Sequence, residues 1–284
     1  MTNDYGNLEL HTVLLAAMKD IDKLCCDNGL RYYLHAGTLL GAVNHKGFIP
    51  WDDDVDIAMF REDYERFIKL VQEEYPDRYF LRNYLTDRTM GGNRSTLCVL
   101  GTEVYHIHED RKSLHREICL DIVPLDAAPD SILLRKLQSD AVFFWDLIAQ
   151  INMGSIIPHN PFLKMAAVLA RMDRVKLGKR IDKLCMKYNG RNTECVGLLS
   201  YTGKNPYTGL SGYENDLLLR KWYEDPVRIP FEDTEFMTIS EPEKDLDHRY
   251  GPHWREPYPE EKRVTKHDVK SYFISDEVKA RVGL

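Results

Sequence analysis

The chain has 284 residues, of which 43% are hydrophobic and 29% are charged, as is ordinary for a globular protein with a substantial core. Its formal net charge of -7 argues against general nucleic-acid binding, which normally requires a basic face. The six cysteines form no CxxC pair, so a structural zinc site is not indicated and reduced thiols are expected. No basic leader with an apolar run and no uncharged apolar stretch of membrane-spanning length is found, so we expect a cytoplasmic protein.

The first predicted elements are a helix, a strand and a short helix. Apolar residues recur at intervals of three and four over residues 10–24, and the pattern stops at Gly29, which predicts an amphipathic helix. Residues 31–35 then resemble a strand that runs into Gly37, where glycine permits a close backbone approach. Thr38 can cap the short helix that follows. A strand that leads into a helix N-terminus is suited to binding phosphate.

The remaining elements predict a mixed α/β fold. Strands are expected at residues 54–59, 79–85, 96–100, 104–108 and 118–123, and two more between 227 and 239. Gly101 and Thr102 are expected to join the third and fourth of these strands as a hairpin. Residues 64–71 mark a further amphipathic helix, and residues 131–188 are helical with a break near 157–161.

We therefore expect a mixed β-sheet flanked by helices, with a helical insertion. The predicted division is a core at 1–130, a mostly helical insertion at 131–225, and a segment at 226–284 that completes the core and the site. Within the insertion, residues 156–169 are expected to form a buried helix, with a peripheral membrane contact as the alternative.

Four acids lie within the five positions 52–56. If residues 54–59 form a strand, the alternation of its side chains places Asp54 and Asp56 on one face and the apolar residues between them in the core. Two neighbouring carboxylates repel each other unless a cation lies between them. Because carboxylate oxygens suit Mg²⁺ or Mn²⁺, this pattern predicts a site for one of these ions.

A calcium-binding loop is an alternative, because Asp52, Asp54 and Asp56 match its first three ligand positions. That loop requires glycine at the position of Ile57 and glutamate at the position of Asp63, so the match fails where the geometry is strictest. A solvated turn is the remaining alternative for the acidic run.

A third acid, Asp121, lies between Leu120 and Ile122 on a predicted central strand. An acid with two buried neighbours indicates a function, either as a metal ligand or as a base for an attacking hydroxyl. The structural alternative is a turn residue at the end of the strand, before Pro124. Asp126 is interpreted as a turn or cap residue.

The run from Tyr33 to Ile57, YLHAGTLLGAVNHKGFIPWDDDVDI, resembles the signature of the LicD family. The resemblance extends over residues 121–126 and returns at 250–251 and 259–263, whereas residues 131–225 are only generically similar. It implies a nucleotidyltransferase-like core, in which a Gly-Ser/Thr turn precedes a strand with Asp-x-Asp and a third acid follows on a later strand.

In this sequence the turn of the family corresponds to residues 37–38, and the acids correspond to Asp54, Asp56 and Asp121. The resemblance thus marks these three acids as catalytic and metal-binding, with Mg²⁺ or Mn²⁺ as the cofactor. The further candidates for substrate binding are Gly37, Thr38, Lys46, His35, Arg263 and His267.

The backbone of Gly37 and Thr38 would bind a phosphate oxygen, with Lys46 as its charge partner. A solvated loop lysine is the alternative for Lys46, and a surface position is the alternative for Arg263 and His267. The first histidine is a candidate general base, and a structural histidine is the alternative. Arg263 and His267 would approach the nucleotide.

The activity that the resemblance implies is transfer of a phosphoalcohol from a CDP-activated donor to a hydroxyl of a cell-surface glycan, such as teichoic acid or lipopolysaccharide, with release of CMP. The first candidate is phosphocholine from CDP-choline. Relatives that resemble fukutin-related protein transfer ribitol phosphate, so the signature does not fix the alcohol. A lipid-linked glycan acceptor would bring the protein to the inner face of the cell membrane, as a peripheral protein.

Two other functions compete with this one. A nucleotidyltransferase would use the same carboxylates but would release pyrophosphate, and a noncatalytic nucleotide-binding scaffold would retain the fold alone. A choline group favours an aromatic cage. The tryptophans available for one are Trp51, Trp145, Trp222 and Trp254.

Overall fold

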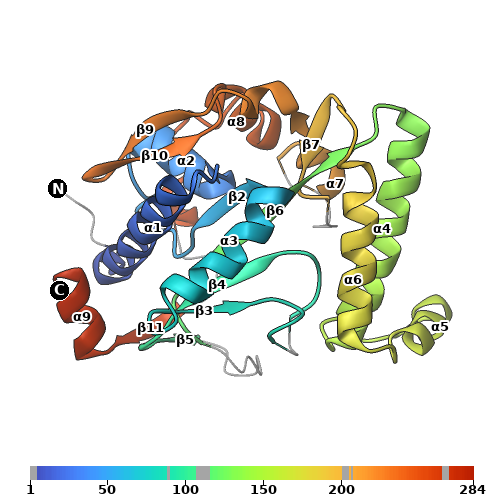
Figure 1. Cartoon of the computed structure of the whole chain (residues 1–284), viewed down its shortest axis with the longest axis horizontal. Coiled ribbons are helices and arrows are strands. Elements are labelled where there is room, and N and C mark those ends of the chain that lie inside the picture. The colour runs from blue at the N-terminus through green and yellow to red at the C-terminus, as the bar shows by residue number, and fades with distance from the viewer. Residues whose placement is uncertain (1–4, 88–89, 107–115, 200–204, 206, 264–268) are drawn as a thin grey trace.

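The computed structural model describes residues 5–87, 90–106, 116–199, 205, 207–263 and 269–284. It is a mixed α/β structure, as predicted, in which helices flank a mixed β-sheet (Figure 1). The first element, α1 (Leu8–Asn28), confirms the predicted amphipathic helix. It ends at Gly29, whose φ of 62° allows its N–H to reach the last carbonyls of the helix.

The central sheet is built around a parallel pair of strands. Its strands follow the order β1 (Tyr33–Leu34), β2 (Asp56–Phe60), β6 (Cys119–Ala128), β4 (Ser95–Val99) and β3 (Tyr79–Arg82). β2 and β6 run parallel, and the other neighbours are antiparallel. The far end of β6 also pairs with β7 (Cys195–Gly197), which pairs with β8 (Leu218–Leu219). Thus residues 131–225 contribute strands to the sheet as well as helices.

The predicted hairpin at Gly101 is wrong. β5 (Thr102–His106) pairs with β11 (Val269–Ile274), which lies more than 160 residues later in the sequence. The reason is that β4 already has β3 on one edge and β6 on the other, so neither edge is open to β5. Residues 107 and 108 of the predicted strand lie outside the described residues.

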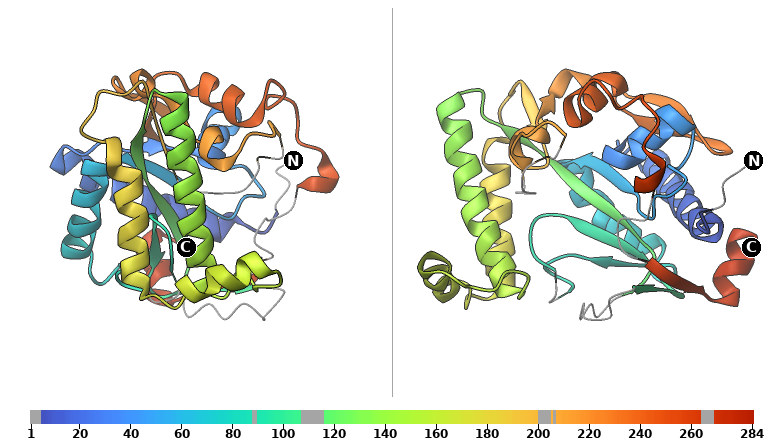
Figure 2. Two further views of the ribbon diagram at one scale, coloured as in Figure 1. Left: turned by 90° about the vertical axis from the view of Figure 1, so that its right-hand side faces the viewer. Right: turned by 180° about the vertical axis from the view of Figure 1, so that it is seen from behind.

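Helices cover one face of the sheet. α3 (Arg61–Glu74) packs on β2, β3 and β6, and α1 packs beside it. Both lie in front of the sheet in Figure 1, whereas the view from behind in Figure 2 looks onto the strands themselves. α2 (Ala36–His45) packs on β2, and α8 (Pro242–Tyr250) packs against α2.

Beyond the end of β6 the chain forms a helical insertion. Its helices are α4 (Ile132–Asn152), α5 (Pro161–Leu169), α6 (Arg174–Cys185) and the 3-10 turn η1 (Met186–Tyr188). These bounds confirm the predicted helical pattern of residues 131–188 and its break. α4 and α6 pack side by side, and α5 lies at one end of the pair (Figure 2, left). In the part of the chain that the structure describes, no helix is long and apolar enough to cross a membrane.

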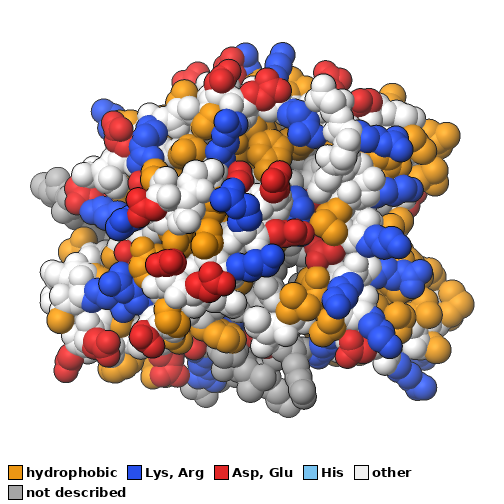
Figure 3. Space-filling view, in the orientation of Figure 1, with side chains coloured by type: hydrophobic (Ala, Val, Ile, Leu, Met, Phe, Trp, Pro, Cys, Tyr) orange, Lys and Arg blue, Asp and Glu red, His pale blue; other side chains and the backbone are white. Residues whose placement is uncertain are grey.

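The rest of the chain returns to the core. Its remaining elements are α7 (Gly212–Asn215), η2 (Arg220–Tyr223), β9 (Val227–Phe231), β10 (Thr234–Thr238), η3 (Glu260–Lys262) and α9 (Asp276–Val282). β9 and β10 form the predicted pair of short strands as an antiparallel hairpin. The largest apolar cluster joins α1, β2, β4 and β6 to this hairpin and to α9. In Figure 3 basic and apolar side chains gather over the part of the molecule that contains the insertion.

Candidate active site

The loop before β2 packs against the first turn of α2. A Cβ atom on Gly37 would lie 3.1 Å from Oδ2 of Asp52, so glycine at this position leaves room for the carboxylate. Asp52 is buried, and its backbone oxygen accepts a hydrogen bond of 3.2 Å from the side chain of Asn7 and lies 2.8 Å from Nε2 of His11. Phosphate binding at Gly37 stays a prediction, and the structure adds that a carboxylate lies beside it.

Thr38 does not cap α2. The helix begins two residues earlier, at Ala36, with His35 as the preceding residue and no side-chain cap. Thr38 therefore falls within the first turn, and its Oγ1 accepts a hydrogen bond of 2.8 Å from the backbone N–H of Asp56. The threonine thus fixes the first residue of β2 against α2.

Asp56 and Asp121 lie side by side. They are partners in the register of the parallel strands β2 and β6. Asp121 accepts a hydrogen bond of 2.8 Å from Oγ1 of Thr96 and lies 3.3 Å from Nη1 of Arg94. Burial raises the pKa of Asp56 well above its usual value, and the charges of Asp54 and Asp121 raise it further, whereas Arg94 lowers it. This environment is one that a cation would stabilise.

The acidic loop supplies further oxygen atoms. Asp52, Asp53 and Asp54 each place a carboxylate oxygen within 4.8 Å of those of the other two. Asp54 connects this group to Asp56, whose pKa it raises. β2 begins at Asp56 rather than at residue 54, so Asp54 is a loop residue and the predicted strand was two residues too long. Carboxylate oxygens at this density fit a hard divalent cation.

The metal site predicted at Asp54, Asp56 and Asp121 stays a prediction. Asp52 and Asp53 are additional donors that the strand argument passed over. The run of acids at 52–56 was the sequence feature that could have indicated them. A loop can turn successive carboxylates toward one point, whereas a strand turns them to opposite faces.

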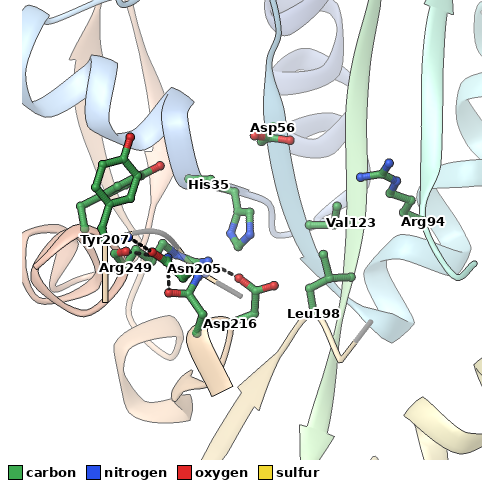
Figure 4. A pocket seen from close by; sticks show the side chains of 12 residues that line it. His35, Asp56, Arg94, Val123, Leu198, Asn205, Tyr207, Asp216 and Arg249 are labelled. Atoms are coloured by element: carbon green, nitrogen blue, oxygen red, sulfur yellow. Dashed lines mark hydrogen bonds and ion pairs between the residues drawn. The ribbon is translucent and has the colours of Figure 1, made fainter. Parts of the chain in front are cut away.

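A cavity of about 220 Å³ adjoins this acidic edge (Figure 4). It is lined by His35, Ala36, Asp56, Arg94, Val123, Leu198, Asn205, Tyr207, Asn215, Asp216, Arg249 and Tyr250. In Figure 4 Asp56 and Arg94 lie on one side, Arg249 and Asn205 on the other, and His35 between them. The cavity is therefore bounded by acidic and basic groups from distant parts of the sequence.

Sequence reasoning missed Arg94 on one side of the cavity and, on the other side, Arg249. Its guanidinium bonds to Asp216 and, at 2.6 Å, to Asp245, and all three side chains are buried. Its Nη2 atom is buried and has no hydrogen-bond partner among the described residues. A buried guanidinium N–H without an acceptor is costly, so this charge cluster at the wall of the cavity is short of one acceptor. The family resemblance at Tyr250 lies next to it and was the available signal.

His35 lies inside the cavity as a neutral side chain. Burial lowers its pKa well below the usual value, and the charge of Arg249 lowers it further. A neutral imidazole has one nitrogen that accepts and one that donates a hydrogen bond. This geometry is compatible with both of the roles that the sequence left open, a general base and a structural histidine.

Lys46 and Arg263, which were predicted to bind substrate, lie outside the cavity lining. Lys46 follows the C-terminal end of α2, opposite to the end that carries Gly37, so the structure does not bring these two together. Arg263 places its guanidinium carbon 5.3 Å from the ring centre of Trp51, which stacks on Tyr258 at 6.0 Å. His267 lies outside the described residues.

Comparison with known proteins finds similarity to one family. Residues 29–118, which include His35, Asp56 and Arg94, match the model described as LicD/FKTN/FKRP, nucleotidyltransferase domain. This segment, about a third of the chain, is thus similar to the LicD family. A Haemophilus influenzae protein named Lipopolysaccharide cholinephosphotransferase LicD is 24% identical over 277 residues, 94% of this chain and 97% of that protein.

Two further proteins match shorter segments of the chain. The human protein named Ribitol 5-phosphate transferase FKRP is 34% identical over 82 residues, 29% of this chain and 16% of the human protein. An uncharacterized Rickettsia typhi protein is 43% identical over 60 residues, 21% of this chain and 19% of that protein. The named relatives are thus phosphotransferases, and the similarity to the bacterial one extends over nearly the whole chain.

Proposed function

We propose that this protein is a member of the LicD family, and that it transfers a phosphoalcohol from a CDP-activated donor to a hydroxyl of a glycan and releases CMP. Phosphocholine is the first candidate, because the relative that matches nearly the whole chain is named a cholinephosphotransferase. The observation that carries the proposal is that Asp56 and Arg94 line one edge of the cavity and that both lie beside Asp121. Phosphoryl transfer requires positioning and neutralisation of charge, and this edge supplies groups for both.

A divalent cation, Mg²⁺ or Mn²⁺, would be held by carboxylates of the acidic loop together with Asp56 and Asp121. When bound, it would neutralise charge on the phosphates of the donor. Arg94 is half-exposed and borders the cavity, so its guanidinium can contact a phosphate oxygen while it orients Asp121.

In the proposed reaction the acceptor hydroxyl attacks the phosphorus atom of the phosphoalcohol, and the bond from that phosphorus to the CMP oxygen breaks. The hydroxyl proton passes to Asp121. Arg249 and His35, deeper in the cavity, would hold polar atoms of the bound substrate. The protein would act in the cytoplasm, at the inner face of the membrane when the acceptor is lipid-linked.

The experiment is to incubate the full chain with Mn²⁺ and each of CDP-choline, CDP-ethanolamine, CDP-glycerol and CDP-ribitol, with and without a glycan acceptor, and to measure CMP. The variants Asp56→Asn and Arg94→Met should lose CMP release. Asp140→Asn is the matched control, because Asp140 is an exposed acid on α4 outside the cavity lining.

The outcomes separate the competing functions. CMP release that depends on Asp56 supports the proposal and identifies the alcohol. Release of pyrophosphate from CTP would instead establish nucleotidyl transfer. If none of the four donors gives CMP and none gives a metal-dependent shift in the melting temperature of the protein, a noncatalytic function replaces the proposal.

A further inference from the structure

The outer side of α5 is an exposed apolar surface. Leu163 and Ala166 are buried, and Ala166 packs in an apolar cluster with Ile148 of α4 and Leu177 of α6, as the prediction of a buried helix requires. The opposite side is not covered, since Met165 is 66% exposed and Val168 is 62% exposed. We call the following residues the α5 patch: Ile157, Phe162, Met165, Val168 and Leu169. The prediction of a buried helix was therefore wrong for half of this helix.

A second exposed apolar group lies at the other end of the insertion. Ile132, Leu133 and Leu137, in the first turns of α4, are 82%, 68% and 56% exposed. α4 has 21 residues and α5 lies near its far end, so roughly 30 Å separates the two groups at 1.5 Å per residue. In Figure 3 apolar side chains occur at both ends of this margin of the molecule and basic side chains lie between them.

The insertion is basic although the chain is acidic. Residues 131–191 contain eleven Lys and Arg but four Asp, a net charge of +7, whereas the whole chain carries -7. Lys176, Lys179 and Lys183 on α6 and Lys164 on α5 are exposed. Among the described residues none of these four lysines forms an ion pair. Their charge is thus available to an external partner.

We propose that the α5 patch and the lysines of α6 bind the surface of a bilayer that contains anionic lipid. Apolar side chains beside a basic face are the combination by which peripheral proteins bind membranes, because the first enter the acyl boundary and the second approach the headgroups. A second copy of the chain is a poorer occupant, since it would oppose two surfaces of net charge +7. The surface is fixed to the core by the ion pair between Arg61 on α3 and Asp182 on α6.

This inference does not depend on the proposed reaction, because the patch lies outside the cavity lining. The test is cosedimentation of the full chain with vesicles of pure phosphatidylcholine or of phosphatidylcholine mixed with phosphatidylglycerol. We expect binding to the mixed vesicles and weaker binding to pure phosphatidylcholine, with a decline as salt is added.

Two variants should weaken the binding. Phe162→Ser with Met165→Ser removes apolar area, and Lys179→Glu reverses a charge. Removal of one lysine charge near an anionic surface should lower the partition coefficient about fivefold, and reversal should lower it further. Leu8→Ser is the matched control, because Leu8 is an apolar residue on α1 that is 72% exposed. Because all these positions are exposed, we expect the variants to melt at the same temperature as the wild type. Such a result would show that each variant folds.

Several results would overturn the proposal. One is equal vesicle binding by the wild type and by the variant that combines Phe162→Ser with Met165→Ser. Another is binding that does not depend on phosphatidylglycerol. A dimer in solution that the serine variant dissociates, with no vesicle binding, would assign the patch to a second copy instead. Capture of an acidic protein that competes with the vesicles and binds more tightly would assign it to a protein partner.

Discussion

The buried ion pair between Arg61 and Asp126 connects three elements of the fold. Nε and Nη2 of Arg61 on α3 donate hydrogen bonds of 2.9 and 2.5 Å to the carboxylate of Asp126 on β6. Nη1 donates at 3.1 Å to Asp182 on α6, and Asn189 also donates to Asp126. The side chain of Arg61 is 10% exposed and that of Asp126 is fully buried. Through Asp182 and Asn189, this ion pair therefore joins the core to the helical insertion.

Arg61→Met should be strongly destabilising. It removes three charge-assisted hydrogen bonds and leaves the carboxylate of Asp126 buried without a cation, which costs about 3–5 kcal/mol in comparable pairs. Asp126→Asn alone should also destabilise. In the Arg61→Met background, however, the same change should stabilise, because it removes the uncompensated charge while an amide oxygen still accepts the hydrogen bond from Asn189.

The assay is urea unfolding followed by tryptophan fluorescence and circular dichroism, with the two single variants and the double variant arranged as a thermodynamic cycle. Arg66→Met is the control, because Arg66 lies on the same helix, is half-exposed and is 3.9 Å from Asp63; its loss should change stability by less than about 1 kcal/mol. A cost for Arg61→Met as small as that of the control would refute the reasoning. Equal effects of Asp126→Asn in both backgrounds would refute it as well.

Three further predictions concern stability. Burial opposes the ionisation of Asp22, but hydrogen bonds from Arg228 and Tyr32 lower its pKa below 3.8, so the ionised carboxylate stabilises the fold above that pH. Asp22→Asn should therefore lower the free energy of unfolding in urea by about 1 kcal/mol at neutral pH. The variant should also lose less stability than the wild type below about pH 4. Because burial lowers the pKa of His35, this histidine binds a proton below about pH 6.5 in the unfolded chain but not in the native chain. The melting temperature of the wild type should therefore fall below that pH, and His35→Gln should reduce the fall. A Cβ atom on Gly41 would lie 2.6 Å from a backbone oxygen of the loop after α2, so Gly41→Ala should cost about 1–3 kcal/mol, whereas an alanine at the unobstructed position 190 should not destabilise.

The local part of the fold could be predicted from the sequence. The spacing of apolar residues gave α1 and the insertion helices, because a helix that packs on one side leaves a pattern within its own residues. The glycine at position 29 marked the end of α1 for a similarly local reason, since its positive φ is disfavoured for other residues. The proximity of Asp56 and Asp121 was also expected, and the parallel register of β2 and β6 brings them side by side.

The long-range part could not be predicted. Nothing near Val104 indicates that β5 pairs with β11 rather than with β4, because pairing depends on which edges are already occupied. Asp126 was interpreted as a turn residue, although it is a fully buried strand residue; its counter-charge, Arg61, lies 65 positions away. Arg249 was missed for the same reason, since its partner Asp216 and the cavity it faces come from elsewhere in the chain.

The two sides of the cavity differ in origin, and this bears on specificity. The segment that matches the family model, residues 29–118, supplies Asp56 and Arg94, whereas the opposite side, with Asn205 and Arg249, comes from later in the chain. The groups suited to phosphate chemistry thus lie on the side defined by the family, which relatives with different named products have in common. The choice of alcohol and acceptor would then depend on the later side, where Asn205 and the buried guanidinium of Arg249 select the shape and polarity of what binds.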